Sequence, residues 1–218
     1  MVRKPICILI AAVFGLAALS TTASGADYAA LERQRWAEAK VNPGDIRQVD
    51  QLLAIFERNK ARYETVSHYG KRPIPAIVIF CLHYRESDAS FRCHASNGDP
   101  LDHRTHNVPK GRLPAPSQPV FKWEDTAIDA YYKMDALGDV NWSDIGTALH
   151  TITLFNGGGY DRKGVPSAYT WARTTAYRRG KYVSDGRYDP YAVDTQVGCA
   201  AILKRFFALH PESSFISR

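Results

Sequence analysis

Glu86 is the residue whose place in the sequence best suits it for acid–base chemistry. It ends an otherwise apolar segment that runs from Ile74 to Leu82. If this segment is a helix, the residues four and seven positions earlier lie on the same side as the glutamate. A carboxyl group held against apolar surface loses solvation of its charged form, so its pKa rises and it can protonate a leaving oxygen. The alternative is a surface glutamate at a helix end, paired with Arg85 or Arg92.

Asn156 precedes three consecutive glycines at the end of another predicted helix. One glycine commonly caps a helix, whereas three let a second backbone or a ligand approach closely, because no Cβ stands in the way. The amide of Asn156 can hydrogen-bond a sugar hydroxyl or an acetamide group. A helix cap and a substrate contact therefore both remain open for Asn156 and Gly157.

The segment from residue 160 to 191 is rich in aromatic and basic side chains. Sugar rings pack well on aromatic faces, and we predict sugar contacts for Tyr169 and Trp171, although most aromatics of such a segment form local core. The aromatic residues are Tyr160, Tyr169, Trp171, Tyr177, Tyr182, Tyr188 and Tyr191. The basic residues, which either meet substrate carboxylates or are solvated, are Arg162, Lys163, Arg173, Arg178 and Arg179.

Histidines on both sides of Glu86 raise the question of a metal site. The possible ligands are His83, His94, His103, His106 and Cys93. Their spacings match no compact zinc pattern. The sequence therefore predicts no metal and no other cofactor, and we expect His83 to orient Glu86 or to tune its protonation.

Helices must position these residues, and the apolar periodicity predicts a mainly α domain. Asn42-Pro43-Gly44 separates the first two helices. The loop 88–122 is rich in turn residues, and loops of that length are usually functional. Ser143 is the expected N-cap of the helix that leads to Asn156. The predicted helices span residues 27–40, 45–68, 73–86, 123–137 and 142–155, and a last one carries Val193, Val197, Ala200, Leu203 and Phe207 on one face.

The first 25 residues have the pattern of a secretory signal peptide. Arg3 and Lys4 precede an apolar run from Ile6 to Leu19, and small residues follow it. The run is short for a membrane span, and the sequence has no second apolar run of spanning length. We therefore expect residues 26–218 to form one secreted or periplasmic domain without stable membrane insertion; an uncleaved anchor is the alternative.

The formal net charge is +6. A modest positive balance suits an exported protein that works on an anionic surface such as a cell wall. The sequence lacks a basic stretch interleaved with aromatics of the kind found in nucleic-acid-binding modules, so we expect no nucleic acid partner. Cysteines of exported proteins can pair. A disulfide between Cys81 and Cys93 would cross-link the segment around Glu86, but with Cys199 as a third thiol the sequence leaves the pairing open.

Two motifs, taken in order, resemble the lysozyme-like family of lytic transglycosylases and goose-type lysozymes. Glu86-Ser87 ends one predicted helix, and Leu154-Phe155-Asn156-Gly157-Gly158 ends another about 70 residues later. In the family a Glu-Ser pair supplies the catalytic acid and an Ala-Tyr-Asn-Ala-Gly motif lines the sugar cleft; Phe155 stands in the place of the tyrosine. The resemblance covers roughly residues 74–160, and the stretch from Asn97 to Leu101 looks like a phage-like branch of cell-wall hydrolases.

The resemblance implies a lysozyme-like helical domain whose long irregular loops form a glycan cleft. It implies a muramidase or lytic transglycosylase that cleaves the β-1,4-linked glycan of peptidoglycan. Glu86 would serve as acid and then as base, with Ser87 supporting it and Asn156 and Gly157 binding sugar. The alternatives are a non-catalytic wall-binding or adaptor domain and a glycosidase that acts on chitin or chitosan.

A second carboxylate would decide the reaction. An inverting hydrolase needs a base roughly 6.5–9.5 Å from the acid, and a retaining one needs a closer nucleophile. Asp88, Asp99 and Asp102 are the candidates. Asp88 is only two residues from Glu86 and would point elsewhere on a helix, and an aspartate before proline, as Asp99 is, often caps its own turn. Lytic transglycosylases work without a second catalytic carboxylate, because a hydroxyl of the substrate closes onto the anomeric carbon. The sequence therefore leaves the product open.

Overall fold

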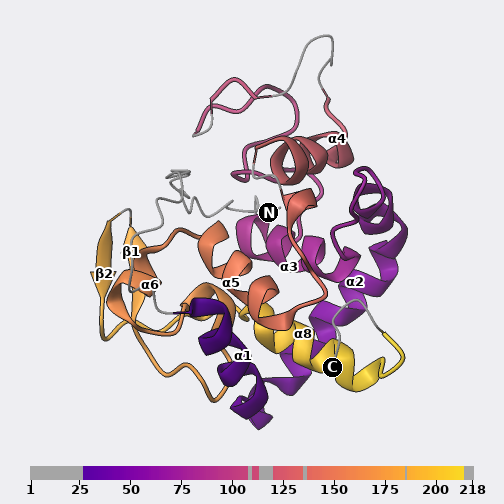
Figure 1. Ribbon diagram of the computed structural model, residues 1–218. Helices are drawn as coiled ribbons and strands as arrows, with labels where there is room; N and C mark the ends of the chain where they lie inside the picture. The colour runs from indigo at the N-terminus through magenta and orange to yellow at the C-terminus, as the bar shows by residue number, and fades with distance from the viewer. Residues whose placement is uncertain (1–26, 108–109, 113–119, 135–136, 185, 214–218) are drawn as a thin grey trace, which may run out of the picture. The chain divides into compact units, whose positions relative to one another are not determined.

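In the computed structural model, more than half of the described residues are helical (Figure 1). Of the described residues 54% are helical and 6% are strand, which confirms the predicted mainly α class. None of the helices in the described part of the chain combines the length and apolarity that crossing a bilayer requires. The predicted signal peptide, residues 1–25, lies outside the described residues. The described residues are 27–107, 110–112, 120–134, 137–184 and 186–213.

The chain divides into two compact units, and the division falls inside helix α2 (Ile46–Ser67). Of the described residues, the first unit comprises 61–138, and the second unit comprises 27–60 and 139–213. The first unit carries Glu86 and the long loop. The second unit carries Asn156 and the aromatic segment.

Helix α3 (Ala76–Ser87) is the core helix of the first unit. Every residue from Ile77 to Glu86 is buried, as expected for a helix that is apolar on all sides. The helix begins after Pro75, where proline is tolerated, and ends at Asp88. The left-handed backbone of Asp88 (φ 51°) lets its N–H donate to two carbonyls of the last turn, which closes the helix end.

Aromatic rings pack around α3. The ring of Tyr63 meets those of Phe80 and Trp123 edge to face, with ring centres 5.5 and 5.4 Å apart. The predicted helix 123–137 begins at Trp123 as expected but changes to π-helical geometry at Asp129. The remaining elements of this unit are the end of α2, α4 (Trp123–Ile128), the π-helical η2 (Asp129–Met134) and the start of the 3-10 turn η3 (Leu137–Asp139).

The described part of the loop 88–122 forms no regular helix or strand, as predicted. Backbone hydrogen bonds within the loop define its path. The N–H of Leu101 donates to the carbonyl of Arg92 at 3.2 Å, and the N–H of Phe121 donates to the carbonyl of Leu101 at 2.8 Å. An isolated bridge pairs Cys93 with Pro100. The loop is therefore held to a defined path beside α3 and α4.

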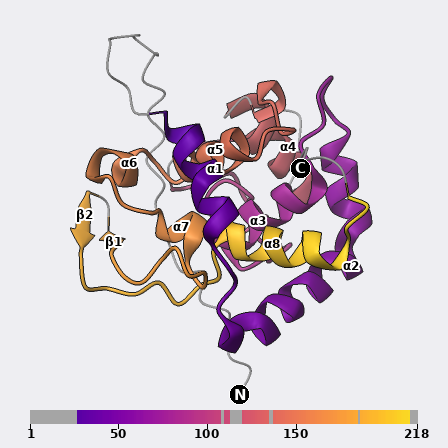
Figure 2. The ribbon, with the colours of Figure 1, turned by 60° about the horizontal axis from the view of Figure 1, so that its bottom comes forward.

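The second unit is built around the contact of α1 with α5 (Figure 2). A Cβ on Gly146 would lie 2.2 Å from the carbonyl oxygen of Ala29, so only glycine permits this approach. Arg33 donates three hydrogen bonds to the carboxylate of Asp144, at 2.7, 2.9 and 3.2 Å. The elements of the second unit are α1 (Tyr28–Glu38), η1 (Pro43–Asp45), the start of α2, α5 (Ile145–Phe155), α6 (Gly159–Lys163), α7 (Ala168–Trp171), β1 (Lys181–Ser184), β2 (Arg187–Asp189) and α8 (Cys199–Leu209).

Asp144, not the predicted Ser143, is the N-cap of α5. Its carboxylate accepts from the N–H of Thr147 at 2.8 Å and from the Thr147 hydroxyl at 2.7 Å. Burial works against its charge, but the hydrogen bonds from Arg33 and Thr147 lower the pKa of Asp144 to about 2. One carboxylate thus both caps α5 and binds α1.

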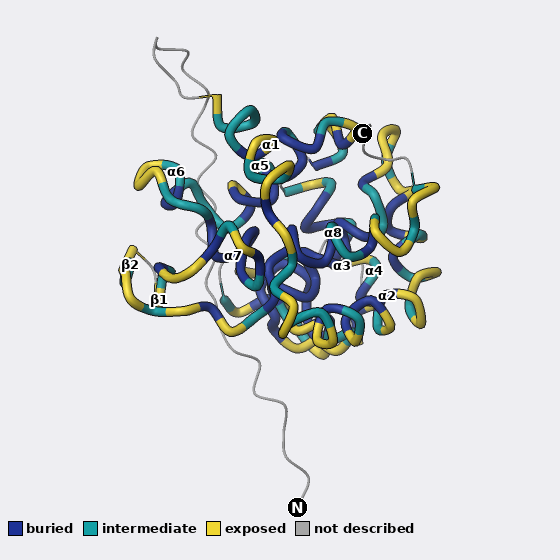
Figure 3. Tube along the Cα trace, turned by 90° about the horizontal axis from the view of Figure 1, so that it is seen from below, coloured by how far each residue is buried: buried dark blue, intermediate teal, exposed yellow. Residues whose placement is uncertain are grey.

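Two further details of the second unit differ from the prediction. The last helix begins only at Cys199, so Val193 and Val197 precede it. The sequence did not predict the antiparallel hairpin in which Tyr182 pairs with Tyr188. Figure 3 shows that the trace of this hairpin is largely exposed or half-buried.

Candidate functional site

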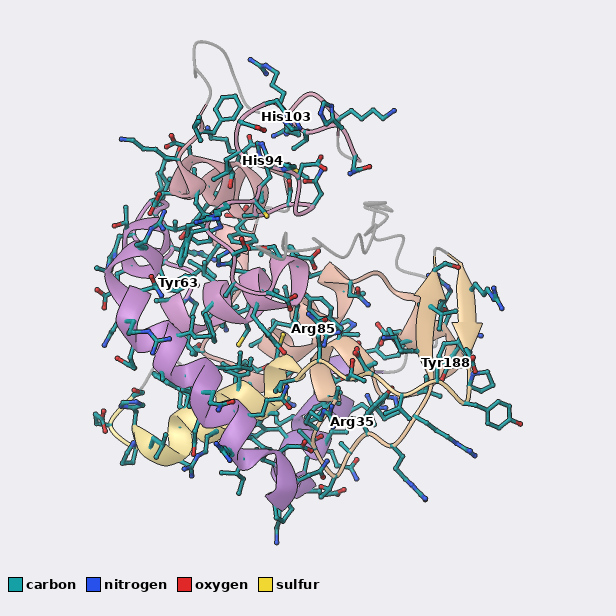
Figure 4. The ribbon with its side chains drawn as sticks, turned by 180° about the vertical axis from the view of Figure 1, so that it is seen from behind. Arg35, Tyr63, Arg85, His94, His103 and Tyr188 are labelled. Atoms are coloured by element: carbon teal, nitrogen blue, oxygen red, sulfur yellow. The ribbon has the colours of Figure 1, made fainter. Side chains whose placement is uncertain are left out.

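Glu86 lies in the last turn of α3 and is only 7% exposed. The neighbouring Arg85, labelled in Figure 4, is buried as well. This burial contradicts the surface position that the alternative reading gave to Glu86. The hydroxyl of Ser87 donates to the carbonyl of His83 at 3.2 Å within the same helix, so its expected support of Glu86 stays a prediction.

His83 is completely buried, and both of its ring nitrogens have partners. Nδ1 lies 3.0 Å from the Tyr63 hydroxyl, and Nε2 lies 3.2 Å from the carbonyl oxygen of Ser90. The tautomer that satisfies both contacts is neutral, with Nε2–H donating to Ser90 and Nδ1 accepting from Tyr63. Burial lowers the pKa of His83 to about 3. The ring of His83 hydrogen-bonds to Tyr63 and Ser90, so its expected effect on Glu86 stays a prediction.

Asp99 organises the loop beside Glu86. Its buried carboxylate accepts from the backbone N–H groups of His106 and Asn107, at 2.8 and 2.9 Å. It also accepts from the side-chain amides of Asn107 and Asn97, at 2.6 and 3.0 Å. Burial alone would raise the pKa of Asp99, but these hydrogen bonds outweigh it and the pKa is lowered. A carboxylate stabilised in this way is a weak proton acceptor, and its contacts are those of a loop anchor.

The loop anchored by Asp99 lies directly on the end of α3. Gly98 has a φ of 74°, which glycine adopts readily, and a Cβ at this position would lie 3.5 Å from the carbonyl oxygen of Glu86. The same Cβ would lie 3.9 Å from Cβ of Ser87. The first unit therefore brings three of the predicted site residues, Glu86, Ser87 and Asp99, into one neighbourhood.

Asp102 lies at the surface, with 70% of its side chain exposed. It contacts Nδ1 of His103, and the His103 ring packs at a tilt against that of His106 with ring centres 3.9 Å apart. Nε2 of His94 donates to the carbonyl of His103 at 2.8 Å, and both residues are labelled in Figure 4. Among the described residues, no three His, Cys, Asp or Glu side chains are arranged to hold a metal ion.

Asn156 and Gly157 lie in the second unit, at the end of α5. Asn156 is the C-cap and is half-buried. Gly157 has a φ of 91°, its N–H donates to the carbonyl of Leu154 at 2.7 Å, and a Cβ on it would meet nothing within 4 Å. By contrast, the ring of Tyr182 packs where a Cβ of Gly159 would stand. Gly157 thus forms the turn and Gly159 makes room for Tyr182, while the space beside Gly157 is open.

Tyr169 and Trp171, the predicted sugar contacts, are 3% and 0% exposed. The indole N–H of Trp171 donates to the buried carboxylate of Glu32 at 2.6 Å, and Arg35 donates to the same carboxylate at 2.8 Å. When protein covers both faces of an aromatic ring, a sugar cannot pack against either face. The burial therefore favours the core role for both residues, and we do not carry them into the proposed site.

Tyr191 belongs to the predicted aromatic segment but is not among its predicted sugar contacts. It is 73% exposed. Asp189 accepts from the N–H of Tyr191 at 2.8 Å and from the N–H of Ala192 at 3.2 Å, so a tight turn holds the tyrosine outward. The available signal was Asp189-Pro190, a turn sequence, because turn residues usually lie at the surface.

The cysteines that follow the predicted signal are all buried thiols. Sγ of Cys93 donates to the hydroxyl of Ser90 at 3.6 Å. The disulfide between Cys81 and Cys93 that the sequence allowed is not made in this structure.

The chain matches no family model, no curated protein and no solved structure, so its function is inferred from its own residues.

Proposed function

We propose that this chain is a lysozyme-like enzyme that cleaves the β-1,4-linked glycan of peptidoglycan with Glu86 as its general acid. The observation that carries the proposal is the burial of Glu86 at the end of a helix that is otherwise largely apolar. Glutamate is seldom buried so completely, and buried titratable groups concentrate at functional sites. The Glu86-Ser87 motif and the predicted export favour the same function.

Glu86 would protonate the glycosidic oxygen while the bond to the anomeric carbon breaks and oxocarbenium-like charge develops on the sugar. The resulting carboxylate would then take a proton from the attacking group. In a hydrolase that group is water, and in a transglycosylase it is a hydroxyl of the same sugar strand. Because the Asp99 carboxylate already accepts four hydrogen bonds and Asp102 is exposed, we propose that Glu86 works without a second catalytic carboxylate. This choice favours transglycosylation.

We further propose that Asn156 and Gly157 contact the sugar. The half-buried amide of Asn156 offers two donors and an acceptor to hydroxyl or acetamide groups, and the open space beside Gly157 admits a ring close to the backbone. An Asn156→Ala variant should weaken binding of glycan fragments while the chain stays folded. Equal affinity in the two proteins would remove Asn156 from the site.

The test of the function is digestion of purified cell walls by the wild-type chain and by Glu86→Gln. The substitution keeps the shape of the side chain but cannot release a proton, so we expect turnover to fall by at least ~100-fold, the scale of general acid catalysis. Asp88→Asn is the matched control: it makes the same chemical change two residues along, at an exposed position where asparagine accepts the left-handed backbone. Undiminished clearing by Glu86→Gln would refute the mechanism.

Mass spectrometry of the digestion products separates the remaining possibilities. Anhydro sugar ends identify a transglycosylase, and reducing ends identify a hydrolase. Binding of cell walls without any product would identify the adaptor alternative. A parallel panel of chitin and chitosan tests the choice of peptidoglycan, because products from these polymers alone would transfer the activity to them.

A further inference from the structure

The hairpin of the second unit is packed rigidly on α6 by three tyrosines. The rings of Tyr160, Tyr182 and Tyr188 meet edge to face, with ring centres between 5.2 and 6.2 Å apart. Tyr160 is buried, and its hydroxyl oxygen accepts from the N–H of Tyr182 at 3.3 Å. Tyr188, labelled in Figure 4, reaches across to the position that a Cβ of Gly180 would fill. This packing fixes the backbone on either side of the hairpin.

The two segments that flank the hairpin are joined by a backbone hydrogen bond, and they expose basic side chains on one segment and apolar or aromatic side chains on the other. The N–H of Gly180 donates to the carbonyl of Ala192 at 2.7 Å, which places Arg179 beside Tyr191. The guanidinium carbon of Arg179 lies 5.1 Å from the centre of the Tyr191 ring. Stacking of this kind restrains the long arginine side chain while its N–H edges stay available. We call Arg178, Arg179, Tyr191 and Val193 the hairpin surface.

All four members of the hairpin surface are exposed, and Tyr191 and Val193 are exposed by 73% and 55%. Within the described residues, neither Arg178 nor Arg179 forms an ion pair. Other cations of the same segment are used by the fold. Arg173 donates to Asp45 at 3.3 Å and to the carbonyl of Thr195 at 2.8 Å. The charges of Arg178 and Arg179 are therefore not used in ion pairs of the fold, and the ring of Tyr191 remains largely open to solvent.

We infer that the hairpin surface binds a polysaccharide that carries carboxylate groups. Arginine presents parallel N–H groups that match a carboxylate, and a tyrosine face packs against a sugar ring. The two kinds of group lie side by side here, so they suit a polymer in which both occur. The nearby carboxylate of Asp189 disfavours the continuous phosphate backbone of a nucleic acid but leaves room for widely spaced carboxylates.

Under the proposed function, the polymer is peptidoglycan and the carboxylates are those of its stem peptides. Binding to the hairpin surface does not require Glu86 to be catalytic. The hairpin surface would then hold the chain on the wall, whereas cleavage would depend on Glu86.

The experiment measures binding of the full chain to purified peptidoglycan sacculi by co-sedimentation at about 50 mM salt, where charge contacts are weakly screened. All samples carry Glu86→Gln so that the polymer stays intact. Arg178→Gln/Arg179→Gln removes two charges from the hairpin surface, and Tyr191→Ala removes the ring. Arg47→Gln/Arg58→Gln is the control, because it removes two charges from exposed positions on α2 of the same unit. Thermal unfolding confirms that each variant is folded.

We expect the hairpin arginine pair and Tyr191→Ala each to weaken binding about tenfold, and the control pair to weaken it less than about twofold. Sacculi whose carboxyl groups have been amidated should bind the unsubstituted hairpin as weakly as native sacculi bind the arginine variant. Equal losses in the two arginine pairs, or full binding to amidated sacculi, would overturn the inference. Tighter arginine-dependent binding to single-stranded DNA or to anionic lipid vesicles would overturn it as well.

Cleavage by the chain with native Glu86 is measured separately, so that the two proposals fail independently. If the chain forms products but the hairpin variants bind as well as the unsubstituted hairpin, only the binding role of the hairpin surface is rejected. If the hairpin variants weaken binding but the chain with native Glu86 forms no products, only the catalytic proposal is rejected.

Discussion

The hydroxyl of Tyr63 lies 3.0 Å from Nδ1 of His83, and both residues are fully buried. This hydrogen bond joins the end of α2 to α3 one turn before Glu86. On the opposite side of the ring, the carbonyl of Ser90 binds Nε2, so the start of the long loop is joined to the same imidazole. A neutral histidine thus connects three segments of the first unit.

This arrangement predicts that the stability of the fold depends on pH through His83. In the unfolded chain histidine binds a proton below about pH 6.5, whereas in the folded protein the pKa of His83 is lowered to about 3. The unfolded state therefore holds more protons between these values. The stabilising contribution is complete above pH 6.5 and is lost progressively as the pH falls towards 3. Urea unfolding between pH 7.5 and 4.5 should show a steeper loss for the wild type than for His83→Gln.

His68→Gln is the control for this measurement. His68 is exposed on the surface of the same unit, so this variant controls for the substitution of a histidine that the fold does not bury. Parallel pH dependences for the wild type and His83→Gln would show that His83 titrates normally in the folded chain.

The helices could be predicted because their apolar spacing is local information. The segment before Glu86 is apolar at nearly every position, and α3 is indeed buried on all sides. Helix ends were predicted less well. Ser143 and Asp144 are both good N-cap residues, and the contact that favours Asp144 comes from Arg33, 111 residues earlier. No local pattern contains that partner.

The hairpin and the fate of the aromatic residues depend on contacts distant in sequence. β1 and β2 have four and three residues, too few for an alternating pattern to stand out. The burial of Trp171 depends on Glu32, 139 residues earlier, and its sequence neighbours give no sign of it. Composition indicated that aromatics gather in this segment, but only packing distinguishes the buried Trp171 from the exposed Tyr191.

Asp99 and Asp102, both predicted as candidates for a second carboxylate, should respond differently to substitution. Asp99→Asn places an amide N–H₂ among donors that point at the carboxylate, so we expect a loss of roughly 1–3 kcal/mol in the free energy of unfolding. Asp102→Asn changes an exposed side chain and should stay within about 0.5 kcal/mol of the wild type. Chemical denaturation measures both.

Cell-wall cleavage assays of the same two variants test the single-carboxylate mechanism. Activity of Asp99→Asn should recover at temperatures where the variant is fully folded, and Asp102→Asn should be as active as the wild type. An inactive Asp102→Asn chain of normal stability would instead identify Asp102 as the second catalytic carboxylate.

Gly146 should tolerate no side chain. A Cβ there would lie 2.2 Å from the carbonyl oxygen of Ala29, and this backbone cannot rotate away as a side chain can. Gly146→Ala should therefore separate α1 from α5 and cost roughly 1–3 kcal/mol, as overpacking usually does. Gly44→Ala is the matched control, because nothing lies within 4 Å of its Cβ position. Thermal unfolding of the two variants should differ by several degrees, and equal midpoints would contradict the close approach of the helices.

Trp171 and Tyr191 should show opposite responses in stability and in binding. Trp171→Phe removes the indole donor to the buried Glu32 carboxylate and leaves the hydrogen bond from Arg35, so we expect a loss of roughly 1–3 kcal/mol in the free energy of unfolding. Sacculus binding by the folded fraction should not change, since the ring is wholly covered. Tyr191→Ala removes an exposed ring and should leave stability within about 0.5 kcal/mol while binding falls. Denaturation and co-sedimentation of the same preparations give all four values. If Trp171→Phe weakened binding at normal stability, the sugar contact predicted for Trp171 would be restored and the core role rejected.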